Sequence, residues 1–378
     1  MTYPIIERLE DALAHVREGV GVHVIRRETY TTIDYAYVTD ALFETDWERE
    51  FRGLKFDREG RLIARPFHKF FNWGETLGPD MDAIDWSRPH VVMEKLDGSM
   101  VHPALLDGAL VMMTRAGITP QSEAALAIAS PAQTAWMREV VERGITPILE
   151  FTAPNNRIVV AYDEPRLTLL AAREMRSGRY LGADELRDLA GDAVPLVEIH
   201  EAVADPKAFL ASARARERVE GYVIAFEDGP RIKVKADAYV LRHKALSALM
   251  FEKNVAAFVL EGAVDDVLPI VSPKAAARLE AYRDALEALI ERQVEIVRTF
   301  HAGHTHLPRR DYAEAAKATF DKRTMSLAFA ALDGKDLRAA YVKLLGALTG
   351  SASRIEANRD LLPEPWVADF LDMDAMTG

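Results

Sequence analysis

The chain has 378 residues, 49% of them hydrophobic, with no cysteine and a net charge of −12 at pH 7. This length supports two domains, and the missing thiols exclude disulfides, a cysteine nucleophile and a zinc–thiolate site. The negative charge argues against a protein that coats nucleic acid non-specifically. It leaves room for a local basic groove, because basic residues cluster in "RPFHKF", "RARER", "RIKVK" and "LPRRDY".

Residues 1–243 are predicted to form an α+β domain with antiparallel or mixed sheets and flanking helices. β-Branched and aromatic residues predict strands in segments 21–38, 90–95, 109–117, 146–152, 157–162, 166–175, 220–226 and 230–236. Helices are predicted within segments 122–144 and 182–190. The sequence predicts neither a secretory signal nor a membrane span, which fits a cytoplasmic protein.

Residues 244–378 are predicted to form an all-α domain, because they are rich in Ala and Leu and poor in strand signals. Ser272 followed by Pro273 predicts a helix start, and apolar residues then recur at helical spacing as far as Phe300. Three histidines follow in "HAGHTHLPRR", namely His301, His304 and His306. A solvent-facing loop is the simpler interpretation of them than a metal site or an RNA contact.

Charged residues on predicted strands point to the chemistry. Lys233 and Lys235 in "RIKVK" alternate with apolar residues, so they share one face of a strand. Such a strand alone is consistent with a solvated face or with an anion site. Glu150 in "ILEFT" and Glu220 in "VEGYVIAF" are predicted to be half-buried carboxylates that need partner cations. Together these residues fit a site for polyphosphate and metal better than unrelated surface charges.

Six motifs in chain order resemble those of covalent nucleotidyltransferases, the polynucleotide ligases and capping enzymes: "RGLKF", "KFFNWGE", "EKLDGS", "EFTAPNNRIVV", "EGYVIAF" and "KVKADAYV". The finer resemblance is to ATP-dependent RNA ligases of the T-even phage RNA ligase 1 family, over about residues 50–243. It implies an enzyme that joins RNA 5′-phosphate and 3′-OH ends through lysyl-AMP and adenylylated RNA. Residues 244–378 would then influence which RNA is chosen.

The resemblance also implies roles for individual residues. Lys95 is expected to be the nucleophile, with Asp97, Lys233 and Lys235 as further catalytic residues. Binding of ATP or its phosphates is expected of Arg52, Lys55, Lys69, Glu94, Arg115 and Gly117, with surface charge or a plain hairpin turn as the alternatives. Glu150 and Glu220 are expected to hold Mg²⁺ or Mn²⁺, its waters, or the lysine itself.

The expected partners are ATP and two RNA ends, a 5′-phosphate donor and a 3′-OH acceptor, with broken tRNA as one candidate. A separate kinase and phosphatase would be needed to heal the ends. One alternative is a DNA ligase or another covalent nucleotidyltransferase, against which the helical tail argues. Another is a non-catalytic RNA- or nucleotide-binding homologue, against which the intact Lys95 and its neighbouring motifs argue.

Overall fold

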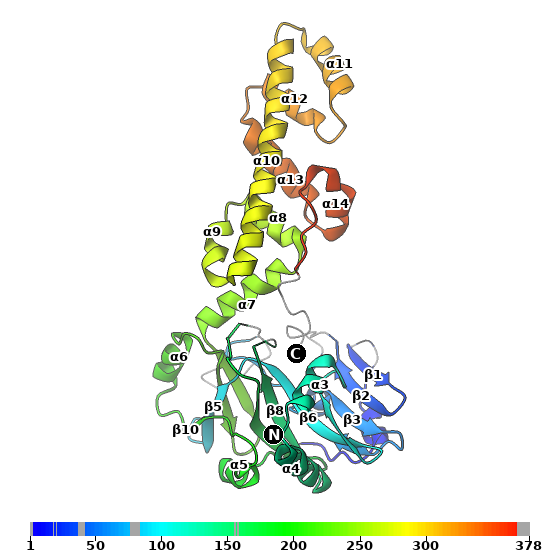
Figure 1. Cartoon of the computed structure of the whole chain (residues 1–378), viewed down its shortest axis with the longest axis vertical. Coiled ribbons are helices and arrows are strands. Elements are labelled where there is room, and N and C mark those ends of the chain that lie inside the picture. Colours follow the sequence, from blue (N-terminus) through cyan, green and yellow to red (C-terminus); the bar gives the residue numbers. More distant parts are fainter. Residues whose placement is uncertain are drawn as a thin grey trace. The chain divides into compact units, whose positions relative to one another are not determined.

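The computed structural model describes residues 3–17, 19, 21–36, 42–75, 84–154, 156 and 159–368. The chain divides into two compact units, Met1–Leu241 and Arg242–Leu371, so the division falls within two residues of the predicted boundary. The first unit is a mixture of antiparallel sheets and helices and the second is helical (Figure 1). The predicted fold class, α+β followed by all-α, is confirmed.

The first sheet of the N-terminal unit has four antiparallel strands in sequence order. They are β1 (Val22–Arg26), β2 (Tyr30–Tyr35), β3 (Leu54–Asp57) and β4 (Leu62–Ala64). Two short helices, α1 (Leu9–Leu13) and α2 (Asp46–Glu50), flank this sheet. Leu9, Ile33, Phe51 and Phe56 form its apolar core and are almost completely buried.

Two further four-stranded sheets build the rest of this unit, in the orders β10-β5-β11-β12 and β7-β6-β8-β9. Their strands are β5 (His90–Lys95), β6 (Ser99–Leu106), β7 (Ala109–Met113), β8 (Ile145–Thr152), β9 (Arg166–Glu174), β10 (Ile199–His200), β11 (Gly221–Phe226) and β12 (Arg231–Lys235). Their helices are α3 (Pro120–Ala127), α4 (Pro131–Glu142), α5 (Ala183–Ala190) and α6 (Pro206–Arg214). One core joins both sheets, since Met93 of β5 packs in the same cluster as Val101 and Phe151 of β6 and β8.

Two predicted elements differ from the structure. Residues 159–162, part of the predicted strand 157–162, form no strand, because the backbone amides of Val159 and Val160 bind a carboxylate instead of a neighbouring strand; residues 157 and 158 lie outside the described part. Segment 122–144 contains two helices rather than one. The second starts where Ser130 caps it through the Gln133 amide and Pro131 takes the first helical position.

The second unit is built from helices only, within the residues that the structure describes. Helix α7 (Asp237–Leu249) begins in the first unit, and its successors are α8 (Glu252–Leu260), α9 (Val264–Val267), α10 (Pro273–His304), α11 (Arg309–Thr319), α12 (Met325–Leu332), α13 (Leu337–Leu348) and α14 (Ala352–Ala357). As predicted, Ser272 caps α10 by accepting a hydrogen bond from the Ala275 amide. None of the described helices is both long and apolar enough to span a membrane.

His301 and His304 lie in the last turn of α10, so the loop predicted for them is wrong at these two positions. His301 approaches the Tyr312 hydroxyl at 3.2 Å, and His304 Nδ1 approaches the Phe300 carbonyl at 2.7 Å. The His304 ring also stacks on Phe300. These contacts place both rings in helix packing and bring them into no metal cluster among the described residues.

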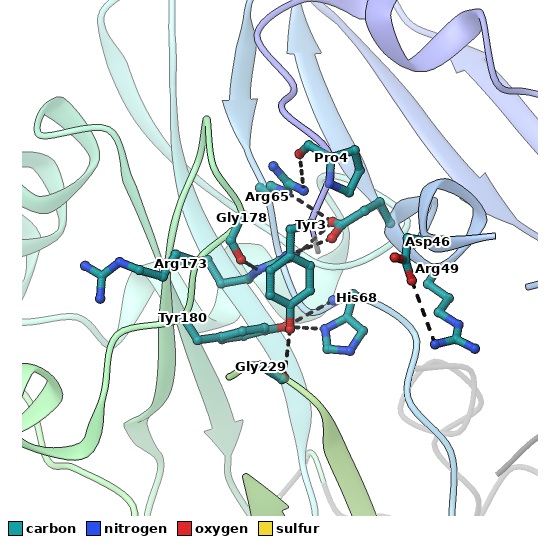
Figure 2. A network of polar contacts seen from close by, with 12 residues as sticks. Tyr3, Pro4, Asp46, Arg49, Arg65, His68, Arg173, Gly178, Tyr180 and Gly229 are labelled. Carbon is teal, nitrogen blue, oxygen red and sulfur yellow. Dashed lines mark hydrogen bonds and ion pairs between the residues drawn. The ribbon is translucent and has the colours of Figure 1, made fainter. Parts of the chain in front are cut away.

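A buried ion cluster ties the first sheet to the third. Glu50, at the end of α2, binds Arg65 at 3.0 Å and accepts two hydrogen bonds from Arg173 of β9, at 2.8 and 3.0 Å. All three side chains are at most 1% exposed. Figure 2 shows the surroundings, in which Arg65 also donates to the Pro4 carbonyl and Arg173 to that of Gly178. Burial alone would raise the pKa of Glu50, but the two guanidiniums outweigh it and lower the pKa to about 2.

Replacing Glu50 by Gln is expected to destabilise the first unit by about 3–5 kcal/mol, because two buried guanidiniums lose their counter-charge. The depressed pKa makes the stabilisation by Glu50 complete above its ordinary value of 4.5 and lost as the pH falls toward about 2. Urea denaturation at a series of pH values measures the free energy of unfolding. Its loss below pH 4.5 that is due to protonation of Glu50 should be present in the wild type and absent in Glu50→Gln. The control is Glu185→Gln, an exposed partner of Arg179. Equal midpoints for Glu50→Gln and the wild type would contradict the prediction.

Candidate active site

The turn after Lys95 carries the chain from the second sheet to the third, because β5 ends at Lys95 and β6 begins at Ser99. Gly98 lies so close to β8 that a Cβ there would be 2.3 Å from the Phe151 carbonyl oxygen. Any larger residue would therefore displace β8 or the turn. The glycine lets the lysine stand at the junction of the two sheets.

Asp97 braces this turn instead of pointing into an open site. Its Oδ2 accepts hydrogen bonds from the amides of Val159 and Val160, at 2.7 and 2.6 Å, and its Oδ1 accepts one from the Tyr239 hydroxyl at 2.8 Å. The Asp97 amide donates to the Tyr162 hydroxyl at 2.9 Å. Because the side chain is 1% exposed and both oxygens are engaged, its geometry suits positioning of the turn rather than direct contact with a substrate.

Lys95 shares the carboxylate of Glu220 with Lys235. The strand register sets Lys95, Gly221 and Lys235 side by side across β5, β11 and β12. Glu220 lies 2.6 Å from Lys95 Nζ through Oε2 and 3.1 Å from Lys235 Nζ through Oε1. Gly221 permits this close packing, since its φ is +145° and a Cβ would lie 2.0 Å from the Val234 carbonyl oxygen.

The charges of this trio set the ionisation of each group. Burial would raise the pKa of Glu220, but Lys95 and Lys235 outweigh it and lower the pKa. Burial by itself would lower the pKa of Lys95. The carboxylates of Glu220 and Glu150 outweigh burial, so the pKa of Lys95 is raised. The protein by itself therefore keeps Lys95 protonated, a form that cannot attack phosphorus.

Among the carboxylates near Lys95, Glu150 of β8 is the one whose negative charge is offset least by neighbouring groups. It is 7% exposed and accepts a hydrogen bond from the Gly98 amide at 3.0 Å. Burial raises its pKa to about 8, and the attraction of Lys95 opposes this only in part, since Glu220 adds repulsion. A buried carboxylate that protein donors satisfy only in part has the chemistry of a divalent cation ligand, so Glu150 fits such an ion as a single ligand. Asp97 and Glu220 do not complete a cluster of three ligands with it among the described residues.

Three more cations, Lys233, Lys69 and Arg52, lie near Lys95 and Lys235. Lys233 shares a face of β12 with Lys235, as predicted, and its Nζ lies 4.7 Å from the Phe70 ring centre. The 70–73 segment runs beside β12, where the Lys233 amide donates to the Phe71 carbonyl at 3.0 Å. This pairing brings Lys69 to the site. Burial and the charges of Arg52, Lys95, Lys69 and Lys235 lower the pKa of Lys233 well below its ordinary value of 10.5.

Aromatic rings hold Lys69 in place. Its Nζ lies 5.0 to 5.5 Å from the ring centres of Tyr35, Phe43 and Phe71. Arg115 covers the same Tyr35 ring at 4.7 Å and binds Asp34 at 3.4 Å. Within the described part of the chain, Lys69 and Lys233 contact no carboxylate, and the same holds for Arg52. Cations gathered without counter-charges form a site for an anion of several charges.

Lys55 does not fit its expected role in phosphate binding. Its side chain is completely buried, and Nζ donates to the carbonyl oxygens of Gly53 and Arg115, both at 2.7 Å. Burial lowers its pKa to about 7. Lys55 therefore fastens β3 to the turn that holds Arg115. In the same turn Gly117 has φ +125° and pairs with Thr114, which matches the hairpin alternative.

Glu94 faces away from the reactive lysine. Successive strand residues point to opposite faces, and Glu94 is paired across from Glu198, whose carbonyl accepts the Glu94 amide hydrogen bond. Ligand atoms of Glu94, Glu198 and His200 lie within 4.8 Å of one another. A phosphate contact by the Glu94 carboxylate at the Lys95 site thus conflicts with the geometry.

Three site residues were missed in the sequence. Tyr162 and Tyr239 brace Asp97, and Phe43 helps to enclose Lys69. Tyr239 lies within the motif "KVKADAYV", four residues after Lys235. The other two follow no spacing that local pattern could reveal, because they meet the site only through the folding of distant segments.

A lysine paired with a buried glutamate, beside cations without counter-charges, fits the covalent nucleotidyltransferases that the sequence motifs resemble. Residues 50–246, a stretch that contains every predicted site residue, match the protein family described as RNA ligase. The chain therefore belongs to the RNA ligase family, of the T4 type, and the predicted family is confirmed.

Individual relatives agree with the family. A Thermovibrio ammonificans protein named "Putative RNA ligase" is 28% identical over 300 residues, which cover 75% of this chain and 78% of that one. "RNA ligase 1" of bacteriophage TS2126 is 34% identical over 234 residues, which cover 57% of this chain and 58% of the phage protein. Among solved structures, an archaeal ATP-dependent RNA ligase covers 78% of this chain and 79% of its own at 18% identity, with a TM-score of 0.46.

Binding of pyrophosphate to the free protein is expected to take up protons, because a polyanion raises the depressed pKa of Lys233. Calorimetry near pH 8 with EDTA, in buffers of different ionisation enthalpy, measures this uptake as up to one proton per site. Lys233→Gln should bind pyrophosphate more weakly and take up fewer protons. Uptake that is unchanged in Lys233→Gln would assign the proton to another group.

Proposed function

We propose that the protein is an ATP-dependent RNA ligase that joins a 5′-phosphate to a 3′-OH in three steps. The shared hydrogen bonding of Glu220 with Lys95 and Lys235, beside Lys233, is the observation that supports this most. In this pairing a lysine suited to be a nucleophile lies next to a group of cations suited to a triphosphate. A nucleotide-binding homologue without catalysis would have no need of this pairing.

In the first step, Lys95 Nζ attacks the α-phosphorus of ATP. Before the attack, one proton leaves the Nζ ammonium along the 2.6 Å contact to Glu220 Oε2. The N–P bond then forms, the P–O bond to pyrophosphate breaks with its electrons on the leaving oxygen, and the second proton passes from the nitrogen to the departing pyrophosphate. In the second step a 5′-phosphate oxygen of RNA attacks the same phosphorus, the P–N bond breaks, and Lys95 Nζ leaves and takes up a proton. In the third step the 3′-OH attacks the activated 5′-phosphorus and loses its proton, and AMP leaves with the electrons of the broken P–O bond and takes up that proton.

Glu150 is the residue that we assign to the divalent cation, Mg²⁺ or Mn²⁺. Glu220 has both oxygens engaged by lysines, and Asp97 has both engaged by protein donors, whereas Glu150 accepts one hydrogen bond from the residues that the structure describes. When bound there, the cation supplies positive charge that favours a neutral Lys95 and balances the phosphates. Glu220 then serves to orient the nucleophile.

The remaining cations are assigned to phosphate oxygens. Lys233 and Lys235 stand on the strand face next to Lys95 and would stabilise charge on the α-phosphate and the leaving pyrophosphate. Arg52 and Lys69 would bind the outer phosphates of ATP or the RNA 5′-phosphate. Arg115 would act through the Tyr35 ring that it shares with Lys69.

The natural substrate is proposed to be broken RNA, with tRNA as one candidate, after a separate kinase and phosphatase have prepared its ends. A cytoplasmic location, where ATP and RNA are both present, stays a prediction. The preference for RNA 5′-phosphate ends is inferred from the family to which the chain belongs and not from the side chains of the site.

Lys95→Ala is expected to abolish transfer of label from α-labelled ATP to the protein, and so is Lys95→Arg, because guanidinium stays protonated. Denaturing electrophoresis detects the lysyl-AMP, and Lys207→Ala, an exposed lysine on α6, is the control. Lys95→Ala should still seal a pre-adenylylated RNA without ATP. Labelling that persists without Lys95 would refute the assignment.

The helical unit is proposed to select among RNA ends, since all the phosphate-binding residues precede it. A chain that ends at residue 250, after α7, keeps the Tyr239 contact to Asp97 and should still form lysyl-AMP. It should lose its preference for a broken hairpin loop over a plain single strand. Circular dichroism first checks that the shortened chain is folded. Full retention of the preference in a folded chain would make the helical unit structural only.

A further inference from the structure

The end of α6 and the loop from it to β11 carry three arginines that the proposed chemistry does not use. Arg214, Arg216 and Arg218 lie in "RARERVE" and are all exposed. None of them makes an ion pair with another described residue, although Glu217 lies between them. By contrast, the exposed Arg179 binds two carboxylates. A local excess of positive charge in a chain of net charge −12 marks this loop as a surface for an anionic partner.

The fold places this loop at the reacting centre. Arg218 precedes Glu220 by two residues, so their Cα atoms are within about 7 Å of each other, and Glu220 binds Lys95. Helix α6 anchors the other end of the loop by packing against β11 and β12 and burying Ala213. The backbone of Arg218 has φ +59°, a left-handed conformation that costs a non-glycine residue about 1–2 kcal/mol. The loop therefore has a defined course that ends beside the nucleophile.

RNA is the anion that fits this position. The cations around Lys233 suffice for the phosphates of ATP and the reacting 5′-phosphate, whereas an RNA strand continues beyond its end with one charge per nucleotide. Arginine binds phosphate through two parallel hydrogen bonds and is suited to follow such a backbone. Arginines at every second residue supply separate contacts along it.

We propose that Arg214, Arg216 and Arg218 form a contact surface for the backbone phosphates of the RNA strand next to the reacting end. This inference rests on the proposed function and extends it from the reacting phosphate to the strand behind it. Because the contacts are to phosphates, they add affinity without base preference.

The test uses the full-length chain with all three arginines changed to Ala. Binding of a fluorescent, 5′-phosphorylated single-stranded RNA is followed by anisotropy over a range of salt concentrations. Binding near 0.1 M salt is expected to weaken roughly tenfold or more, and the slope of log K against log[salt] to fall by about 2, since each contact to single-stranded RNA contributes about 0.7. Labelling with ATP should be unchanged, because these residues do not touch the nucleotide.

Two control variants separate an effect of these three arginines from a general loss of positive charge. Changing Arg138 of α4, Arg143 directly after α4 and Arg187 of α5 to Ala removes the same number of positive charges elsewhere and should leave RNA binding nearly unchanged. Changing Arg214, Arg216 and Arg218 to Lys keeps the charge and should retain most of the affinity and the salt slope. If the triple Ala variant labels poorly, the single variants Arg214→Ala and Arg216→Ala carry the test: each should weaken RNA binding and lower the salt slope by about 0.7, and an unchanged slope in both would overturn the proposal.

Unchanged affinity and slope in the Ala variant would overturn the proposal, and so would an equal loss in the Arg138, Arg143 and Arg187 control. The first result would assign the loop to a different anionic partner, such as an acidic protein. Failure of the proposed function is a separate outcome, since it would show as a wild-type protein that forms no lysyl-AMP.

Discussion

The buried pairing of Glu50 with Arg65 and Arg173 is the interaction on which the site depends most. Glu50 and Arg65 belong to the segments around the first sheet, and Arg173 belongs to β9 of the third. Arg52 follows Glu50 by two residues, and Lys69 follows Arg65 by four. The Lys69 amide also donates to the Arg49 carbonyl beside Glu50, at 2.6 Å. The cluster thus sets the positions of two cations that face β12 of the second sheet.

The site around Lys95 and Lys233 brings like charges close together, where they repel one another. Four cations, Arg52, Lys69, Lys95 and Lys235, gather around Lys233. Asp97, Glu150 and Glu220 gather around Lys95. Burial of like charges is unfavourable unless the surrounding structure imposes it. Here two features impose it: the three-strand register of Lys95, Gly221 and Lys235, and the turn that Asp97 braces. A nucleotide triphosphate with its cation has the charge distribution that relieves both groups at once.

Backbone geometry leaves no room for a side chain at the two motif glycines, Gly98 and Gly221. At Gly98 the turn passes within contact distance of β8, and at Gly221 β11 passes equally close to β12. Each close approach aligns a carboxylate: the Gly98 amide binds Glu150, and Gly221 follows Glu220 directly. The acidic side chains are therefore positioned by neighbouring glycine backbone rather than by their own packing.

The sequence by itself determined the features that depend on local pattern. Alternation in "RIKVK" predicted that Lys233 and Lys235 share a face, Ser272 and Pro273 marked a helix start, and the ordered motifs indicated the RNA ligase family. These properties require only the period of a strand, the geometry of a helix cap and the order of motifs along the chain.

Only the tertiary structure decided which charged residues face Lys95. Lys55 and Lys69 look alike in their motifs, yet Lys55 binds two buried carbonyl oxygens while Lys69 lies among aromatic rings beside β12. Glu94 is adjacent to Lys95 and points to the opposite face, whereas Glu220 is 125 residues away and binds it. Burial, strand register and contacts between distant segments produce these differences, and no local pattern encodes the distance between two residues that meet only after the chain folds.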